Sequence, residues 1–472
     1  MADRWRLRGP VAPVAPVAPV RDDGDLTRKG DRPVKHYVVI SSDTHAGPNS
    51  PVYRDYLDPE FRAAFDEELA ERQALIDARR VDAEASPFVG DAEFKEEWFG
   101  EDDEGNSLHE VGLRGGWDAA TRDKELDNDG VAAEVVFPGP DAATGTMGAP
   151  FGAGFIPVAT RDAAHLLAGA RAYNRWAAEL CQASPERRAG LIVAPILGDL
   201  DGAIAEIERA HADGLTGGII IPPRWGDYES YTSYRYDPVW ARCEELGLPV
   251  HCHSGPAPQE EYGLVDGWMS VYGYETIFYT ARPLWFMLLT GVFERFPGLK
   301  MAVTEAGCFW AADFLWRADM MATREHGMRK MVNTRGILTM LPSEYFDRNV
   351  KIGASNTRRR ELGRRYEIGV GNIMWGNDFP HPEGTWPYTR EFLKERFWDI
   401  PIDETEQILG LNQVDFYGFD LEKLGPIAER IGPTPEDLGQ TDATVFAKWE
   451  PYKSIGRPWL TGEEAGASLT DR

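Results

Sequence analysis

Residues 37–45 read YVVISSDTH, an apolar run followed by two side chains that can bind a metal ion. The run from Tyr37 to Ile40 consists of β-branched and aromatic residues, which is typical of a buried strand. Asp43 and His45 follow it two positions apart. Because side chains alternate between the two faces of a strand, both residues point to the same side and can reach one ion. The stretch therefore predicts a strand that ends in a pair of metal ligands.

Seven more short apolar runs follow along the chain, with longer helical patterns between them. The runs cover residues 133–137, 190–194, 218–221, 248–250, 300–303, 350–352 and 372–375. Helices are predicted at residues 161–182, 200–213, 238–246, 283–296, 310–326 and 358–367. Apolar strands separated by helices indicate a parallel sheet that is covered on its outer face. Eight such units predict an α/β fold, the (β/α)8 TIM barrel.

We expect the chain to have three parts. Residues 1–33 contain repeated Val-Ala-Pro triplets, which favour extended conformations and predict a disordered arm. The barrel is expected over residues 34–420, with a long insertion at 51–117 after the first strand. Residues 421–472 are expected to form a C-terminal extension that packs on the barrel or on a partner subunit.

Charge and composition exclude several classes of function. The 77 acidic and 50 basic side chains give a formal net charge of −27, which would repel nucleic acid and anionic lipids. No apolar run is long enough for a transmembrane helix, and the first residues lack the apolar core of a signal peptide. The 4 cysteines are widely spaced and form no disulfide framework. We therefore expect a cytoplasmic protein that binds neither nucleic acid nor membranes.

Further side chains of the metal-binding kind lie at the ends of other predicted strands. His251 and His253 end the fifth strand, Glu305 follows the sixth and Asp378 follows the eighth. In such barrels the carboxyl ends of all strands meet at one face, which carries the active site. The predicted ligands of one divalent ion are Asp43, His45, His253 and Asp378.

The mixture of imidazole and carboxylate donors suits a borderline divalent ion. Zn²⁺ is the expected metal, and Mn²⁺, Co²⁺ and Fe²⁺ are also compatible with these ligand types. The sequence contains no GxSxG motif, P-loop or dinucleotide-binding fingerprint, so no other catalytic signature competes with the metal site.

Several segments give the chain a resemblance to a known family. They read VVISSDTHAGP, LPVHCHSG, GVFERFPGLKMAVTEAGCFW, IMWGNDFPH and ILGLNQVDFYGFD. With these segments the chain resembles the amidohydrolase-related (amidohydrolase 2) family, which contains aminocarboxymuconate-semialdehyde decarboxylase and γ-resorcylate decarboxylase. The resemblance implies a barrel that holds a single divalent ion and commonly forms a homodimer or a higher homo-oligomer.

Carried over by position, the resemblance places the family's first-strand ligands on Asp43 and His45 and its later ligands on His253 and Asp378. The chain departs from the decarboxylases after strand six, where they carry a histidine and this sequence has Glu305. Glu305 could bind the ion, hold its water molecule, or carry a proton if burial raises its pKa. The alternative is a structural carboxylate that pins a neighbouring loop.

Two more histidines are candidates for the site. His381, in the motif DFPH, follows Asp378 closely and could shuttle protons or contact substrate. The alternative is an ordinary loop histidine. His251 should point inward by parity, so it could contact substrate, or it could be a buried histidine satisfied by hydrogen bonds.

Arg282, Arg317 and Trp310 are candidates for binding substrate. Both arginines lie on helices that flank strand six, and Arg317 falls near the position where the related decarboxylases supply an arginine for the substrate carboxylate. The alternative for both is a solvated helix face. Trp310 is one of several tryptophans near strand ends, where an indole ring would suit an aromatic substrate. The alternative for Trp310 is a place in the core.

Together these residues predict an enzyme, first of all a metal-dependent hydrolase acting on a small cyclic or aromatic substrate. A bound ion would lower the pKa of a water molecule, and Asp378 would take and return the proton, with Glu305 and His381 as further catalytic groups. The alternative is a nonoxidative, metal-dependent decarboxylase of an aromatic or unsaturated carboxylic acid. A minor alternative is an inactive barrel that only binds a ligand.

Overall fold

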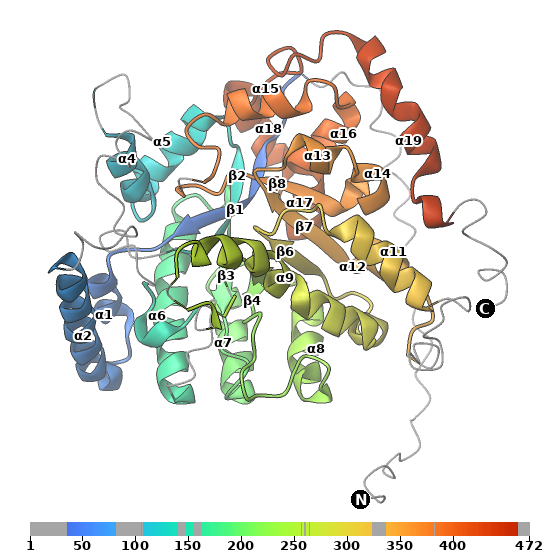
Figure 1. Cartoon of the computed structure of the whole chain (residues 1–472). Coiled ribbons are helices and arrows are strands. Elements are labelled where there is room, and N and C mark those ends of the chain that lie inside the picture. The colour runs from blue at the N-terminus through green and yellow to red at the C-terminus, as the bar shows by residue number, and fades with distance from the viewer. Residues whose placement is uncertain are drawn as a thin grey trace, which may run out of the picture. The chain divides into compact units, whose positions relative to one another are not determined.

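Eight parallel strands lie at the centre of the molecule and pair in sequence order, from β1 to β8 (Figure 1). The computed structural model describes residues 35–81, 105, 107–139, 148–154, 162–255, 257–258, 261–263, 265–322, 337–381 and 383–460. The strands are β1 (Ile40–Ala46), β2 (Ala133–Pro138), β3 (Arg188–Val193), β4 (Gly218–Ile220), β5 (Val250–His253), β6 (Met301–Thr304), β7 (Val350–Ser355) and β8 (Ile373–Gly376).

The sheet closes on itself where the chain leaves β8. The backbone amide of Asp378 donates to the carbonyl of Asp43 at 3.0 Å, and the amide of His45 donates to the carbonyl of Phe379 at 2.7 Å. These hydrogen bonds extend the pairing from β8 to β1, so the described strands form a barrel. The predicted (β/α)8 TIM barrel is confirmed.

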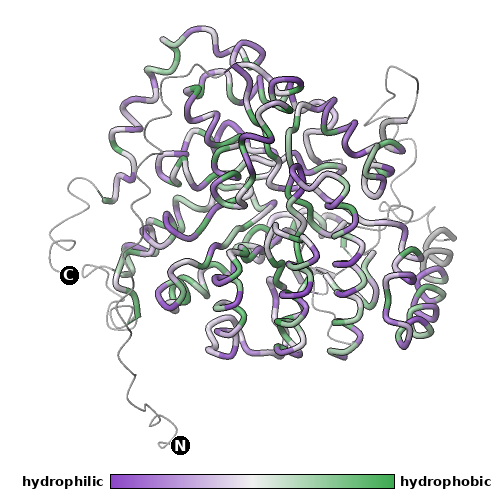
Figure 2. Tube along the Cα trace, turned by 180° about the vertical axis from the view of Figure 1, so that it is seen from behind, coloured by the Kyte–Doolittle hydropathy of each residue, from purple (hydrophilic) through white to green (hydrophobic). Residues whose placement is uncertain are grey.

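Helices surround the barrel and alternate with its strands (Figure 1). Between β2 and β8 they are α6 (Ala163–Gln182), α7 (Leu200–Ala212), α8 (Asp237–Leu246), α9 (Trp268–Leu289), α10 (Val292–Arg295), α11 (Ala311–Ala322), α12 (Pro342–Asn349), α13 (Arg359–Leu362) and α14 (Arg365–Ile368). After β8 come α15 (Thr389–Phe397), α16 (Ile402–Glu406), α17 (Asn412–Tyr417), α18 (Leu421–Ile431) and α19 (Glu450–Ile455). Hydrophobic and hydrophilic positions alternate along these helices (Figure 2), as expected when one face of each covers the barrel.

Local sequence explains where several helices begin and end. The Asp199 side chain accepts a hydrogen bond from the Gly202 amide at 3.0 Å and so caps the first turn of α7. Gly247 ends α8 in the left-handed conformation, with φ of 69°, which a glycine adopts without steric cost.

The ends of the first and fifth strands agree with the sequence prediction, whereas several helix boundaries differ from it; residues 358–367, for example, form two short helices, α13 and α14. His45 and His253 lie in the last residues of β1 and β5, as expected. The helix predicted to start at Pro283 starts at Trp268 instead, and Pro283 lies inside α9. The prediction treated the proline as a first-turn residue, and the apolar residues before it, which occur all around the helix, show little helical periodicity.

The predicted insertion after the first strand contains α1 (Tyr53–Tyr56), α2 (Arg62–Val81) and α4 (Leu108–Gly115), while residues 82–104 and 106 lie outside the described part. Helix α4 packs tightly on the loop after β8. A Cβ atom at Gly112 would lie 2.9 Å from the Trp386 ring, and one at Gly115 would lie 2.7 Å from the Phe379 ring. A larger side chain at either position would therefore push α4 away from the loop that carries Asp378.

The described part of the C-terminal extension is anchored on the barrel. The Trp449 indole donates to the carbonyl of Asp399 at 2.7 Å, and the Trp459 indole donates to the Asp319 carboxylate at 2.9 Å. The predicted arm, residues 1–33, and the end of the extension, residues 461–472, lie outside the described residues. The domain boundaries stay predictions. Among the described helices, none combines the length and the apolar character that crossing a lipid bilayer requires.

Candidate metal site

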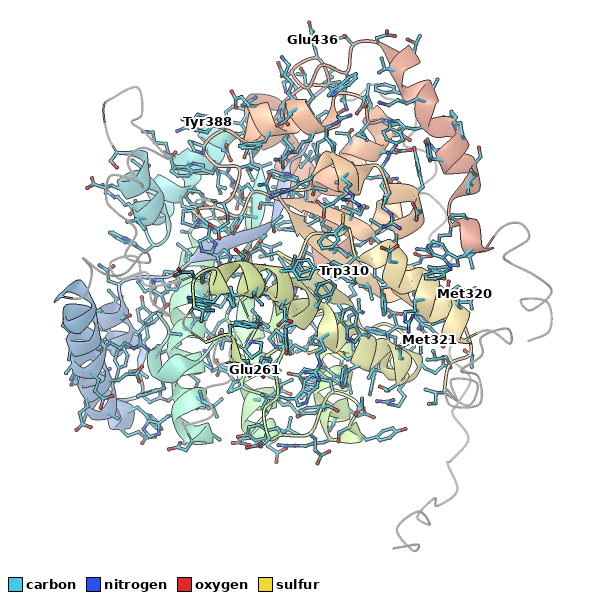
Figure 3. All side chains as sticks on the ribbon, viewed as in Figure 1. Glu261, Trp310, Met320, Met321, Tyr388 and Glu436 are labelled. Carbon is cyan, nitrogen blue, oxygen red and sulfur yellow. The ribbon has the colours of Figure 1, made fainter. Side chains whose placement is uncertain are left out.

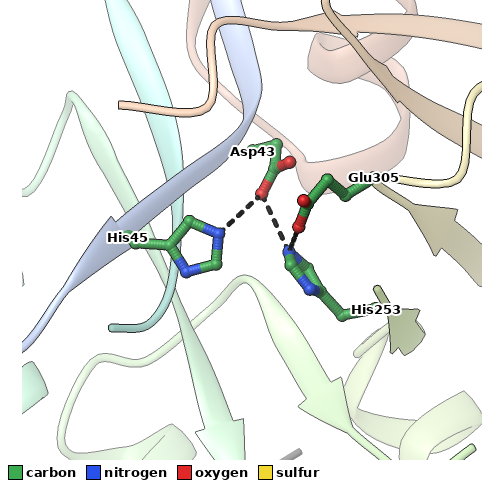
Figure 4. Close-up of side chains that lie close together, drawn as sticks. All are labelled: Asp43, His45, His253 and Glu305. Atoms are coloured by element: carbon green, nitrogen blue, oxygen red, sulfur yellow. Dashed lines mark hydrogen bonds and ion pairs between the residues drawn. The ribbon is translucent and has the colours of Figure 1, made fainter. Parts of the chain in front are cut away.

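Four side chains from three strand ends meet at the carboxyl ends of the strands (Figure 4). Asp43 and His45 come from β1, His253 from β5, and Glu305 directly follows β6. Nε2 of His253 lies 3.1 Å from Asp43 Oδ1 and 3.3 Å from Glu305 Oε2. One potential ligand atom from each of the four residues lies within 4.8 Å of the others, so the group could hold a metal ion.

Asp378, which follows β8, joins this cluster through His45. Nε2 of His45 lies 3.5 Å from Asp43 Oδ1 and 3.4 Å from Asp378 Oδ1. Asp378 Oδ1 also lies 3.0 Å from Nδ1 of His381, whose ring stacks on the His45 ring with centroids 4.1 Å apart. The structure therefore brings three of the predicted ligands, Asp43, His45 and His253, into one group with Glu305. Asp378 lies beside this group and forms a second one with His45 and His381.

Both cluster histidines are oriented as metal ligands usually are. Nδ1 of His45 lies 3.0 Å from the carbonyl of Pro138, and Nδ1 of His253 lies 3.3 Å from the carbonyl of Ser254. If Nδ1 carries the proton and donates it to the carbonyl, the lone pair of Nε2 faces the carboxylates. A backbone carbonyl that fixes the tautomer in this way is the common partner of a metal-binding histidine. The donor set therefore fits a divalent cation.

Burial and crowding of like charges shift the pKa values in the cluster. Burial raises the pKa of Asp378, and the nearby Asp43 raises it further. Burial and the charge of Asp378 also raise the pKa of Glu305. Burial and the neighbouring His381 lower the pKa of His45 to about 3, which keeps its imidazole neutral. Burial lowers the pKa of His253, but the charges of Asp43 and Glu305 outweigh it and raise that pKa. Carboxylates crowded in this way are an environment that a cation stabilises.

The carboxylates that follow β6 and β8 lie on unusual backbone. Glu305 has a φ of 56° and Asp378 a φ of 59°, the left-handed region that residues other than glycine seldom adopt. Such strain persists only where surrounding contacts hold it, and it is common at functional sites.

Residues that the sequence did not single out support the cluster. The Ser355 hydroxyl, at the end of β7, donates to Oδ2 of Asp43. Arg122 Nη1 donates to the carbonyl of His45 at 2.9 Å, and the same guanidinium pairs with Glu134 at 2.7 Å. Ser355 could have been found by its position at a strand end, whereas nothing in the sequence pairs Arg122 with His45.

The structure does not bring the four predicted substrate-binding residues into this cluster. His251 lies deeper in the barrel, where Nε2 is 3.1 Å from the carbonyl of Gly217 and the ring stacks on Tyr417 with centroids 5.7 Å apart. Trp310, labelled in Figure 3, is buried, and its indole donates to the carbonyl of Gly307 at 3.1 Å.

The two arginines are also placed in other surroundings. The Arg282 guanidinium lies 4.5 Å from the centroid of the Trp225 ring, a cation–π contact that occupies one face of the group. Arg317 is exposed on α11. Substrate binding by these residues remains a prediction.

Comparison with known proteins agrees with the resemblance in sequence. The Amidohydrolase family model matches residues 120–419. The 6-methylsalicylic acid decarboxylase of Penicillium expansum is 24% identical over 232 residues, which cover 49% of this chain and 68% of that protein. The gamma-resorcylate decarboxylase of Rhodococcus jostii is 25% identical over 233 residues, which cover 45% of this chain and 66% of that protein.

A solved structure of 5-carboxyvanillate decarboxylase from Novosphingobium aromaticivorans, with bound manganese, has the same fold. Its TM-score is 0.54 at 16% identity, and the match covers 81% of this chain and 97% of that chain. The family model spans well over half of the sequence. The chain therefore belongs to the amidohydrolase family and is an enzyme.

Proposed function

We propose that this enzyme is a nonoxidative, metal-dependent decarboxylase of a hydroxylated aromatic acid. The observation that carries the proposal is the match to sequence relatives whose names describe decarboxylation of salicylic and resorcylic acids. The sequence alone ranked hydrolysis first, because the strand-end ligands suggested an ion that activates water and because Glu305 stands where the decarboxylases carry a histidine. The relatives favour the alternative over hydrolysis.

The proposed ligands are Asp43, His45, His253 and Asp378. A divalent ion bound to them would supply positive charge that holds the carboxylate and the neighbouring phenol oxygen of such an acid. Two carboxylates and two imidazoles suit Mn²⁺ as well as Zn²⁺. Because the solved 5-carboxyvanillate decarboxylase holds manganese, we propose Mn²⁺ as the ion to test first.

Decarboxylation requires one proton at the ring carbon that carries the carboxylate. The proton forms a C–H bond there, the C–C bond to the carboxylate then breaks, and its electron pair returns to the ring as carbon dioxide leaves. We propose that Glu305 and His381 deliver this proton, because their side chains are 21% and 24% exposed and so have contact with solvent. The four proposed ligands are at most 3% exposed and so have little contact with solvent.

The test is release of carbon dioxide. Protein loaded with Mn²⁺ is incubated with 6-methylsalicylate, 2,6-dihydroxybenzoate and 5-carboxyvanillate, and carbon dioxide and the decarboxylated phenol are measured together. We expect equal amounts of both products from at least one acid, and none after the metal is removed with a chelator. Hydrolysis of amide or lactone analogues without any release of carbon dioxide would contradict the proposal and favour the hydrolase.

Three finer expectations stay predictions. They are the preference for zinc, the homodimer or higher homo-oligomer, and the cytoplasmic location. The substrate is proposed to be a small molecule, in agreement with the names of the relatives.

A further inference from the structure

A buried polar network joins the end of α5 (Ala119–Asp129) to the loop that carries Asp378. Asp129 is the last residue of α5 and is 3% exposed. Its Oδ2 accepts hydrogen bonds from Asn377 Nδ2 at 3.1 Å and from the Thr389 hydroxyl at 2.6 Å. Its Oδ1 accepts a third hydrogen bond from the Thr389 backbone amide at 3.1 Å. The carboxylate thus binds both ends of the segment from Asn377 to Thr389.

Asn377 passes this restraint on to the metal site. Its Oδ1 lies 2.8 Å from the Ser41 hydroxyl and accepts from the Phe379 amide at 3.3 Å. Its own backbone amide donates to the Ser41 hydroxyl at 3.0 Å, and that hydroxyl lies 2.7 Å from the carbonyl of Asp43. The Asn377 side chain therefore connects the backbone on both sides of Asp378 to the backbone of Asp43.

The hydrogen bond from Asp129 decides which way the Asn377 amide faces. An asparagine side chain carries an NH₂ group, which donates, and a carbonyl oxygen, which accepts. The two groups have nearly the same size, so hydrogen-bond partners decide which way each one faces. A carboxylate at Asp129 accepts from the NH₂ group, so the oxygen must face Ser41 and Phe379. Without an acceptor at residue 129, the amide could turn over and lose both contacts.

Burying a carboxylate costs free energy unless hydrogen bonds or a paired charge offset the loss of its hydration. Arg390 is the cation whose charge acts on Asp129, yet it donates to the carbonyl of Ile431 instead. Burial accordingly raises the pKa of Asp129 to about 6. The hydrogen bonds from Asn377 and Thr389 offset this cost. Because all three groups donate, position 129 needs a side chain that accepts, and an aspartate does so with both oxygens.

We infer that Asp129 is a positioning residue for the metal site: it orients Asn377, which holds Asp378 and Asp43 at the separation that one ion needs. The inference rests on the proposed metal site and deepens it. Asp378 already lies on left-handed backbone and donates its amide to Asp43, so a loosened loop would let the two carboxylates move apart. Loss of such supporting partners typically costs about 10–100-fold in metal affinity.

The experiment measures Mn²⁺ binding to the full chain by electron paramagnetic resonance of the free ion. In the variant Asp129→Asn the new NH₂ group faces donors, so Mn²⁺ should bind roughly 10–100-fold more weakly than to the wild type. The variant Asn377→Asp places two carboxylates against each other and should weaken binding too. In the double variant the donor and the acceptor exchange places, and the affinity should recover to within about threefold of the wild type.

The variant Asp319→Asn is the matched control. Asp319 is also a buried carboxylate with a raised pKa, and it accepts from the Ser343 amide and the Trp459 indole, each at 2.9 Å. It lies outside the network, so its replacement should leave Mn²⁺ affinity unchanged while lowering stability. If Asp129→Asn acted only through a general loss of structure, Asp319→Asn would weaken Mn²⁺ binding as well.

The outcomes separate this inference from the proposed function. Equal Mn²⁺ affinity in the wild type and in Asp129→Asn would overturn the positioning role and leave the metal site standing. A double variant whose Mn²⁺ affinity does not recover would overturn the positioning role as well. This test also applies if Asp129→Asn alone does not fold. A wild-type chain that binds no Mn²⁺, Zn²⁺ or Co²⁺ would overturn the metal site itself and, with it, this inference.

Discussion

Replacing His253 with alanine is expected to abolish stoichiometric metal binding and to lower turnover by on the order of 10³-fold or more. His253 lies on β5, across the barrel from the ligands of β1 and β8. Its Nε2 is the nitrogen that separates Asp43 from Glu305, at 3.1 Å and 3.3 Å. Without it, no ligand from β5 remains, and the carboxylates of the cluster face one another with less to balance their charge.

The measurement combines metal analysis of the purified protein with turnover of the best aromatic acid. The matched control is His251→Ala, which also removes an imidazole from β5. The His251 ring contacts the carbonyl of Gly217 and lies outside the cluster. That variant should lose stability but keep its metal. A His253→Ala protein that retains one ion per chain and full turnover would show that this histidine is not a ligand.

Replacing Arg122 with methionine is expected to lower the free energy of unfolding by about 3–5 kcal/mol. Arg122 and Glu134 are fully buried, and their two hydrogen bonds are both 2.7 Å long. Methionine cannot pair with the carboxylate, which is left with Arg188 as its other cation at 3.1 Å. The substitution also removes the hydrogen bond to the carbonyl of His45, so metal affinity should fall as well.

The loss should depend on pH with a definite sign. Burial alone would raise the pKa of Glu134, but Arg122 and Arg188 lower it to about 2. A carboxyl whose pKa is lowered in the folded state stabilises the protein above its unfolded pKa of about 4.3 and loses that contribution as the pH falls through 2. In the variant this pKa rises, so the difference in stability should be largest at neutral pH and should narrow under acid conditions.

Urea denaturation at pH 7 and at about pH 3 measures both effects. The double variant Arg122→Met/Glu134→Leu provides the control, since replacing both partners of a buried ion pair with apolar residues is often close to neutral. It should recover most of the lost stability. A single variant that is as stable as the wild type at pH 7 would contradict the role given to this pair.

The barrel and the potential ligands could be predicted because both depend on local patterns. Apolar runs mark buried strands, and side-chain parity places Asp43 beside His45 whatever the rest of the chain does. Parity does not give depth, however. His251 points inward as predicted but lies two residues, about 7 Å, further down the strand than His253, which places it below the cluster.

The supporting contacts could not be predicted because they join distant parts of the chain. Asn377 and Asp129 are 248 positions apart, and Ser355 and Asp43 are 312 positions apart. No pattern in one sequence pairs such residues before the barrel is closed. The start of α9 was missed for a different reason, since a helix that is apolar on all sides lacks the periodicity by which helices are recognised.

The central claim is that side chains from β1, β5 and β8 hold one divalent ion. Anomalous X-ray scattering from crystals loaded with Mn²⁺ tests it most directly. We predict one strong peak about 2.0–2.4 Å from a carboxylate oxygen of Asp43, Nε2 of His45, Nε2 of His253 and a carboxylate oxygen of Asp378. If a loaded crystal showed no anomalous peak at these four side chains, or showed its peak elsewhere, the proposed metal site would be wrong.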